Sequence, residues 1–449
     1  MSRVTCAALA CAVSAAGLGA PAARANPVEL FGFGSRHGAH AGAGIADVDD
    51  MAATWMNPAG LAAGRRTLTT GFLGAVSNLR IDDRRSPLSQ PGGGLFGVTV
   101  PAPLGGPLAG RIGLGLGMFV LPTSVVRITA VFPDQPLFPF YQGRSERLVV
   151  VPGLGVRVTD AIAVGVAANV LAGLGGDITA GEGATRALEA RVDEVVPAVA
   201  RLIVGVRWAL PRQLAVAAVY RQRFEVPFDT TAHTEVAGEP IDLDLAASAQ
   251  FSPHQVALGA TWRPPGGALH LDLGYARWST YPGPFVAVSS ALPLVGPLAA
   301  ELPAVPWHDT VAVRVGGDVD LGSTVVGRAG YGFETSPVPA DQPGVTNLLD
   351  GPKHTVALGA SITWPRAVAG KPVTLSVHGQ AQLVGARTLT KRILAAGDPG
   401  GTFDGLRDEV TDDPQDPATQ GAQISNPGYP TLESHGQVFS GGLTLEVGL

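Results

Sequence analysis

Four arginines occupy odd positions in two neighbouring segments whose apolar residues alternate. They are Arg201, Arg207, Arg221 and Arg223. Because side chains of a strand alternate between its two faces, this parity places all four guanidinium groups on the polar face. A guanidinium group offers a two-pronged donor that matches a carboxylate. The four arginines therefore have two possible roles. They could bind a substrate carboxylate in the lumen, or pair with interior acids such as Glu225, Asp318 and Asp320.

Histidines and aspartates gather near residue 40, and both residue types can ligate metals. They are His37, His40, Asp47, Asp49 and Asp50. Their spacing is not that of a known metal-binding loop, and a polar segment needs such side chains for hydrogen bonds to its surroundings. The two cysteines, Cys6 and Cys11, lie within the first 25 residues. We therefore expect no metal and no cofactor.

Catalytic patterns are scarce in the sequence. Ser376 and His378 are neighbours on one strand face, which would suit a lipid-modifying barrel enzyme only if that face met lipid. No Gly-x-Ser-x-Gly turn, phosphate-binding glycine loop or zinc-protease motif occurs. We therefore predict that the protein is not an enzyme.

The composition excludes several classes of protein. The 449 residues include 60 Gly and 37 Pro, which disfavour a mostly helical chain because both residues break helix interiors. A hydrophobic share of 46% and a charged share of 15% are too apolar for a disordered chain. The formal net charge of −6 gives no electrostatic reason to expect a nucleic-acid partner.

The first 25 residues have the pattern of a secretory signal peptide. Arg3 precedes an apolar run from Cys6 to Leu18, and Ala23 and Ala25 supply the small residues of a cleavage site. The run is shorter than the roughly 20 apolar residues that cross a bilayer as a helix. We expect an exported protein, with residues 1–25 as the signal peptide.

Apolar residues in the rest of the chain recur with a period of two. Leu269, Leu271 and Leu273 alternate with His270 and Asp272, and other segments repeat this pattern. The segments run about 10 to 14 residues, longer than the roughly five to six of soluble strands. That length suits a tilted strand crossing a bilayer. Fourteen such segments are predicted, the eighth being uncertain because residues 241–248 could form part of it or a separate strand.

Connections between these segments alternate between tight turns and long loops. Thr159–Asp160 and Leu321–Gly322 are tight, whereas residues 174–198 and 387–434 are long. Outer-membrane barrels have short turns at one end and long loops at the other, and a secreted β-sandwich, the alternative, has no reason to sort its loops. We predict an all-β, 14-stranded antiparallel transmembrane β-barrel over residues 67–449, located in the cell outer membrane of a Gram-negative bacterium.

Residues 26–66 do not alternate and are rich in Gly and Ala. A lumen enclosed by fourteen strands is wider than wall side chains fill, so we expect this segment to fold back as an N-terminal plug. A second non-alternating stretch, residues 122–145, is apolar and aromatic. It contains Phe132, Leu137, Phe138, Phe140 and Tyr141. It could form an outer groove that captures a hydrophobic ligand, or fold over the barrel mouth or onto lipid headgroups.

Several motifs, in order along the chain, carry a family resemblance. They are Gly32–Gly42, Trp55–Leu61, Tyr275–Ser279, Trp307–Thr310, Arg328–Tyr331 and Ser336–Pro339. In this order the chain resembles the FadL-type outer-membrane transporters of long-chain fatty acids and other hydrophobic compounds. The Asn-Pro-Ala step of that family's hatch matches Asn57, Pro58 and Ala59. The resemblance covers nearly the whole mature chain.

The resemblance implies a plugged fourteen-stranded barrel in which an apolar groove captures the substrate, an internal pocket receives it and a shift of the hatch releases it passively. We expect a monomer whose partners are a fatty acid or hydrocarbon, outer-membrane lipid and lipopolysaccharide, and the barrel assembly machinery, with no nucleic acid. The alternatives are a plugged structural or adhesive barrel without transport and, further behind, a lipid-modifying enzyme.

Overall fold

The computed structural model describes most of the chain after the expected signal peptide. The described residues are 27–86, 88, 90, 92–121, 126–127, 136–141, 146–172, 175–182, 188–195, 198–236, 239–292, 296–299, 303–340, 342, 346–390 and 431–449. The expected signal peptide, Phe132 and residues 391–430 lie outside this set. In the part of the chain that is described, no helix is long and apolar enough to cross a membrane.

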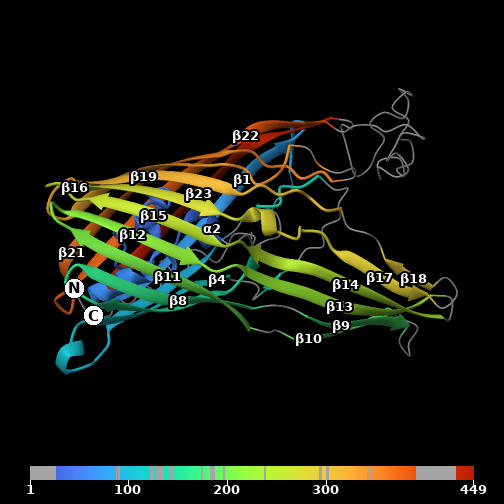
Figure 1. Cartoon of the computed structure of the whole chain (residues 1–449), viewed down its shortest axis with the longest axis horizontal. Helices are drawn as coiled ribbons and strands as arrows, with labels where there is room; N and C mark the ends of the chain where they lie inside the picture. Colours follow the sequence, from blue (N-terminus) through green and yellow to red (C-terminus); the bar gives the residue numbers. More distant parts are fainter. Residues whose placement is uncertain are drawn as a thin grey trace.

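A closed antiparallel barrel dominates the molecule (Figure 1). Its sheet contains fifteen strands, of which the two-residue β2 (Arg84–Arg85) only extends a hairpin from β1. The other fourteen close on themselves because β1 pairs with β23 on one side and with β3 on the other. The predicted fourteen-stranded barrel is therefore confirmed. Closure leaves no unpaired sheet edge, which a spanning sheet requires in lipid.

The barrel strands follow one another around the wall in sequence order. They are β1 (Thr67–Ile81), β3 (Gly92–Pro101), β4 (Ile112–Val120), β7 (Val149–Arg157), β8 (Ile162–Ala172), β11 (Ala198–Leu210), β12 (Leu214–Arg221), β15 (Gln255–Trp262), β16 (Gly267–Ala276), β19 (Thr310–Asp320), β20 (Val325–Glu334), β21 (Lys353–Val368), β22 (Lys371–Thr390) and β23 (Thr431–Gly448). The sequence pattern predicts strand starts at Glu146, Phe251 and Trp307, whereas the corresponding barrel strands begin at Val149, Gln255 and Thr310. Glu146 and Phe251 belong to other strands, outside the barrel wall.

The two faces of the wall differ as the alternation predicts. On β16, Leu269, Leu271 and Leu273 are about half exposed at 52%, 46% and 49%, whereas His270 and Asp272 are buried at 2% and 3%. The same division holds on β19, where Val311, Val313 and Val315 face outward. An outer surface of large apolar side chains is stable only against lipid. The barrel therefore has the surface of a membrane-spanning protein.

Long connections leave one end of the barrel, opposite the end that carries the C-terminus (Figure 1). Six strands there form a second sheet, with β9 parallel to β13 and the other pairs antiparallel. They are β10 (Leu188–Val195), β9 (Gly175–Glu182), β13 (Phe224–Val236), β14 (Glu239–Ser252), β17 (Ala287–Leu292) and β18 (Gly296–Ala299). Residues 241–248 thus belong to a separate strand, β14, one of the two alternatives left open by the sequence.

Short elements complete the chain. β5 (Val126–Arg127) pairs with β6 (Glu146–Arg147), η2 (Gly106–Leu108) lies between β3 and β4, and η3 (Trp278–Thr280) follows β16. Before β1 come α2 (Pro27–Phe31), α3 (Ser35–Gly38), α4 (Ala53–Met56) and η1 (Pro58–Ala63). We call residues 27–66, which hold these four, the N-terminal segment. Its side chains are mostly buried, and it packs against the inward faces of the barrel strands.

Candidate functional site

The Asn-Pro-Ala step forms the start of η1 and lies against the wall. Asn57 is fully buried, and its side-chain oxygen accepts a hydrogen bond from the Ala59 amide at 3.1 Å, which caps the helix. Its Nδ2 donates to the carbonyl of Ile45 at 2.9 Å and lies 3.4 Å from the carbonyl of Val206 on β11. Asn57 therefore joins two turns of the N-terminal segment to each other and to the barrel.

Glycines of the adjacent strands let the backbone of η1 touch the wall. A Cβ placed at Gly165 on β8 would collide with the backbone of Pro58 and Ala59, and one at Gly205 on β11 would collide with Asn57. The remaining members of this glycine wall contact Phe33, Thr54, Leu61 or their neighbours. They are Gly113, Gly115, Gly117, Gly153 and Gly155. Close backbone approach is the usual reason for glycine inside a strand.

On the other side of the barrel, wall side chains reach the backbone of the N-terminal segment. Gln380 on β22 donates to the carbonyls of Phe31 and Gly38 at 2.9 and 2.7 Å. Asp272 on β16 accepts from the amides of Gly44 and Ile45 at 2.8 and 3.1 Å. These bonds satisfy buried backbone groups that no helix or sheet pairs.

An ion cluster lies within the N-terminal segment itself. Arg36 contacts Asp49 at 2.7 Å and Asp47 at 3.1 Å, and Asp47 also binds Arg263 of the wall. Burial opposes ionisation of Asp49, but the facing Arg36 and Arg65 lower its pKa to about 2. Burial raises the pKa of Asp50. Asp47 and Asp49 are thus committed to arginines rather than grouped with His37 and His40 for a metal.

Three of the four predicted lumen arginines face inward. Arg207 donates from Nε to the carbonyl of Ala46 at 2.8 Å, and Arg221 donates to the carbonyls of Trp55 and Met56 at 3.2 and 3.1 Å. Arg201 is 1% exposed and lies over the Trp55 ring, with Nε and Nη2 lacking a hydrogen-bond partner among the described residues.

Arg223 is different, and its expected place on the lumen face is wrong. β12 ends at Arg221, so the alternation that placed Arg223 inside no longer applies two residues later. The side chain is 40% exposed, pairs with Glu225 and lies over the Phe251 ring.

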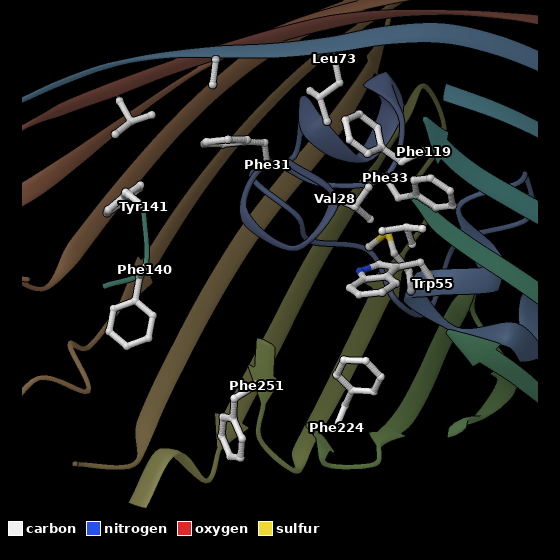
Figure 2. Packing of buried hydrophobic residues seen from close by; sticks show 14 of the residues in the cluster. Val28, Phe31, Phe33, Trp55, Leu73, Phe119, Phe140, Tyr141, Phe224 and Phe251 are labelled. Atoms are coloured by element: carbon white, nitrogen blue, oxygen red, sulfur yellow. The ribbon is translucent and has the colours of Figure 1, made fainter. Parts of the chain in front are cut away.

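A cavity of about 250 Å³, which we call the lumen pocket, lies between the N-terminal segment and the wall. The N-terminal segment contributes Phe31 and Trp55, and the wall contributes residues of β15, β16 and β19 to β22. Phe140, Phe251 and Trp278 line it from the connections at the end with long loops. Figure 2 shows Phe31, Trp55, Phe140 and Phe251 around the same interior space. The pocket is apolar on several sides, as binding sites for small hydrophobic molecules are.

Aromatic rings continue from the pocket toward that end of the barrel. Phe140 meets Trp278 at 4.9 Å between ring centroids, Phe251 meets Tyr281 at 5.0 Å, and Tyr281 meets Trp307 at 4.8 Å. All five are buried at 9% exposure or less. Phe251, Trp278, Tyr281 and Trp307 were not predicted as site residues from the sequence. Trp278 and Trp307 nevertheless occur in motifs that carry the family resemblance.

The aromatic loop is buried rather than exposed. Leu137, Phe138, Phe140 and Tyr141 are 6% exposed or less, and Leu137 pairs with the segment at Asn347–Leu349 through two backbone hydrogen bonds of 3.1 and 2.8 Å. Of the two interpretations of this loop, the burial favours one that folds over the barrel mouth. Burial raises the pKa of Tyr141 well above its usual value. Phe132 lies outside the described residues.

Most charged groups that line the pocket are engaged. Arg314 contacts Glu334 at 3.0 Å, and Lys353 contacts Asp350 at 3.1 Å while lying over the Phe140 and Tyr141 rings. Arg221 is engaged with carbonyls, as described above, and Glu29 accepts a hydrogen bond from Ser252 at 2.8 Å. Asp272 is the exception among the described residues, because its Oδ2 is hydrogen-bonded and its Oδ1 has no partner. The lining cations are therefore engaged, whereas one carboxylate oxygen is free.

Comparison with known proteins finds relatives through structure alone. No protein-family model matches the chain, and no curated protein is similar to it in sequence. A Pseudomonas aeruginosa FadL homologue is 12% identical with a TM-score of 0.53, over 95% of this chain and 98% of that one. The Pseudomonas putida toluene transporter TodX is 14% identical with a TM-score of 0.58, over 94% and 99%. The Ralstonia pickettii toluene transporter TbuX is 14% identical with a TM-score of 0.54, over 94% and 99%.

These likenesses establish the fold. The molecule is a closed antiparallel β-barrel of fourteen strands. Its fold is that of FadL-type outer-membrane transporters, and the resemblance noted in the sequence motifs extends over nearly the whole chain at the level of structure.

Proposed function

We propose that the protein is a passive channel that takes up hydrophobic small molecules through the outer membrane. The observation that carries this proposal is the lumen pocket, a cavity lined by aromatic rings between the N-terminal segment and the wall. A structural or adhesive barrel has no need of such a cavity. The FadL-type fold supports the same conclusion, since the structures it resembles are named as a FadL homologue and as toluene transporters.

The pocket favours an uncharged cargo of aromatic character. Phe31, Trp55, Phe140, Phe251 and Trp278 present ring faces and edges, which suit offset or edge-to-face contacts with another ring. The lining cations are paired, so the burial of a carboxylate in the pocket would require one of these pairs to open. A hydrocarbon fits the described lining without such a rearrangement.

A carboxylate-bearing cargo such as a fatty acid is a second candidate, and Arg201 is the observation that favours it. Its Nε and Nη2 are buried without a hydrogen-bond partner among the described residues, and such donors are costly to leave unpaired. Arg201 lies over the Trp55 ring, and Trp55 lines the pocket whereas Arg201 does not. A carboxylate would reach it only after Trp55 moved.

In this proposal the N-terminal segment is the hatch, and Asn57, Pro58 and Ala59 are its anchor against the wall. The segment fills the interior between the pocket and the glycine wall, so passage needs it to shift. Leu137, Phe138, Phe140 and Tyr141 form the entrance, with Phe140 as the side chain that passes cargo from the aromatic loop to the pocket.

Uptake by whole cells tests the proposal. Cells expressing the full chain should accumulate radiolabelled toluene faster than cells without it, and Phe251→Ala should slow this uptake because it removes a ring from the pocket. Phe439→Ala is the matched control, since Phe439 is 49% exposed on the lipid face. Equal accumulation with and without the protein, or equal slowing by both variants, would contradict the proposal.

A further inference from the structure

Three potential metal ligands from different parts of the chain meet inside the barrel. His40 comes from the N-terminal segment, His270 from β16 and Asp318 from β19, and their ligand atoms lie within 4.8 Å of one another. His40 Nε2 is 2.7 Å from Asp318 Oδ1, and His270 Nε2 is 3.9 Å from Asp318 Oδ2. Both imidazoles are buried, and Asp318 is 10% exposed.

The separations are close to those of a formed metal site. Zinc binds imidazole nitrogen and carboxylate oxygen at about 2.0–2.2 Å in a tetrahedron, which places neighbouring ligand atoms about 3.3 Å apart. One observed separation from Asp318 is shorter than this value and one is longer, and all three ligand atoms lie within 4.8 Å of one another, so side-chain movements of about 1 Å would bring them to zinc-binding distances. Two histidines and one carboxylate leave the fourth position for water, as in open zinc sites.

A nitrogen without a partner points into the cluster. Nδ1 of His270 lies 2.9 Å from Thr261 Oγ1 on the adjacent strand, whereas Nε2 has no hydrogen-bond partner among the described residues. In the tautomer in which Nδ1–H donates to Thr261, Nε2 carries a free lone pair directed at Asp318. A hydrogen bond that orients the far nitrogen is the usual support of a metal-bound histidine.

The carboxylate of Asp318 has a further neighbour. Arg328 also contacts Asp318, through Nε at 2.9 Å. A metal would replace that contact at one carboxylate oxygen, and Arg328 would keep its hydrogen bond to Ser361.

We propose that His40, His270 and Asp318 form a binding site for a divalent cation of the zinc type, which links the N-terminal segment to strands β16 and β19. Imidazole and carboxylate together suit Zn²⁺ better than Mg²⁺ or Ca²⁺, which prefer ligand sets made only of oxygen. The inference is independent of which molecule crosses the barrel.

Metal titration of the purified, metal-stripped protein in detergent tests this site. We expect the wild-type protein to bind one zinc ion per chain, and Co²⁺ in its place to give the intense visible absorption of tetrahedral coordination. His270→Ala should lose the cobalt band, and Thr261→Val should weaken zinc binding by about tenfold or more, because it removes only the orienting hydrogen bond.

His378→Ala is the matched control. His378 is also a buried wall histidine and contacts the N-terminal segment at Gly38, but it belongs to no three-ligand group among the described residues. It should keep the cobalt band and the zinc affinity of the wild type. The proposal is overturned if the wild-type protein binds no zinc, or if zinc affinity is the same in wild type, His270→Ala and Thr261→Val. Thr261→Val nearly preserves side-chain shape, so the test survives misfolding of His270→Ala.

Discussion

The two sides of the barrel wall hold the N-terminal segment by different physical means. On β4, β7, β8 and β11, glycines occupy the inward positions beneath η1, whose backbone lies directly against them. On β16, β19, β20 and β22, glycines such as Gly330 also approach the segment, but charged and polar side chains such as Asp272, Asp318 and Gln380 add hydrogen bonds and ion pairs to it.

This difference indicates which side can open. Backbone contact across the glycine wall depends on shape, so a shift of η1 would leave a void and lose many small dispersion contacts at once. Polar contacts can be exchanged one at a time with water or with a ligand. The lumen pocket lies beside the polar side, with Asp272, Arg314 and Gln380 in its lining. We therefore expect the glycine wall to anchor the segment and the polar wall to release it.

The largest effect should come from filling the glycine wall. In Gly165→Val the new side chain would meet the backbone of Pro58 and Ala59, which cannot rotate away. Overpacking of this kind costs about 3 kcal/mol. We expect η1 to be displaced, with a lower unfolding temperature in detergent and a higher ion conductance in planar bilayers.

Gly379→Val provides the comparison for that substitution. Gly379 lies on β22, and a Cβ there meets no atom within 4 Å. Its unfolding temperature and conductance should stay close to those of the wild type. If both valine variants behave alike, the glycine wall is not the anchor.

A smaller effect is expected from Asn57→Ala, which removes the cap of η1 and the bond to Ile45 but creates no clash. Loss of a buried hydrogen-bonding side chain costs about 2 kcal/mol. We expect the channel to open briefly rather than permanently, and single-channel recordings would detect these openings. Asn57→Asp keeps the acceptor for the Ala59 amide and should preserve the cap. If single-channel recordings of Asn57→Ala show no openings, Asn57 does not anchor the N-terminal segment.

Much of the barrel could be predicted from the sequence because its determinants are local. The alternation of Leu269, Leu271 and Leu273 with His270 and Asp272 reports the two faces directly. Strand ends were less predictable, since Trp307 lies in a connection and Phe251 belongs to β14 of the second sheet, although both are as apolar as residues of a barrel strand. The separate sheet formed by β13 and β14 required knowledge of pairing between segments.

The candidate site was only partly predictable. The inward positions of Arg201, Arg207 and Arg221 could be predicted because side chains alternate between the two faces of a strand. The prediction for Arg223 was wrong because this alternation stops where β12 ends. The aromatic rings of the pocket come from connections far apart in sequence, so no spacing rule joins Phe140 to Trp278. One signal was present but unused. Glycine recurs at every second position from Gly113 to Gly117, which marks close approach to a strand face.

Acid should loosen the polar side before it affects the rest. Burial and the neighbouring Arg36 lower the pKa of His37 well below its usual value of 6.5, so folding keeps this imidazole neutral. The neutral imidazole makes its full contribution to the free energy of unfolding above pH 6.5. As the pH falls below that value, the free energy of unfolding decreases by about 1 kcal/mol per pH unit. The charged surroundings of His37 are Arg36 and Asp50, with His40 and His270 nearby.

We expect the unfolding temperature of the wild-type protein to fall between pH 6.5 and 5, and His37→Gln to flatten this decline. Asp49 does not contribute in this range, because the arginines around it hold its pKa at about 2 despite its burial, and its contribution to stability begins to fall only below about pH 4. A wild-type profile that is flat to pH 4 would show that the polar side does not respond to protons as proposed.

The smallest expected effect concerns the selection of cargo, and it compares the two candidates for function. Arg201→Gln removes a buried cation that has unpaired donors but lies outside the pocket lining. If carboxylates cross by displacing Trp55 toward the wall, uptake of radiolabelled oleate should fall several-fold while toluene uptake stays unchanged. Arg223→Gln is the matched control, because Arg223 is exposed and already paired with Glu225. Equal uptake of oleate by both variants would remove Arg201 as a carboxylate site and leave the neutral pocket as the sole basis of selection.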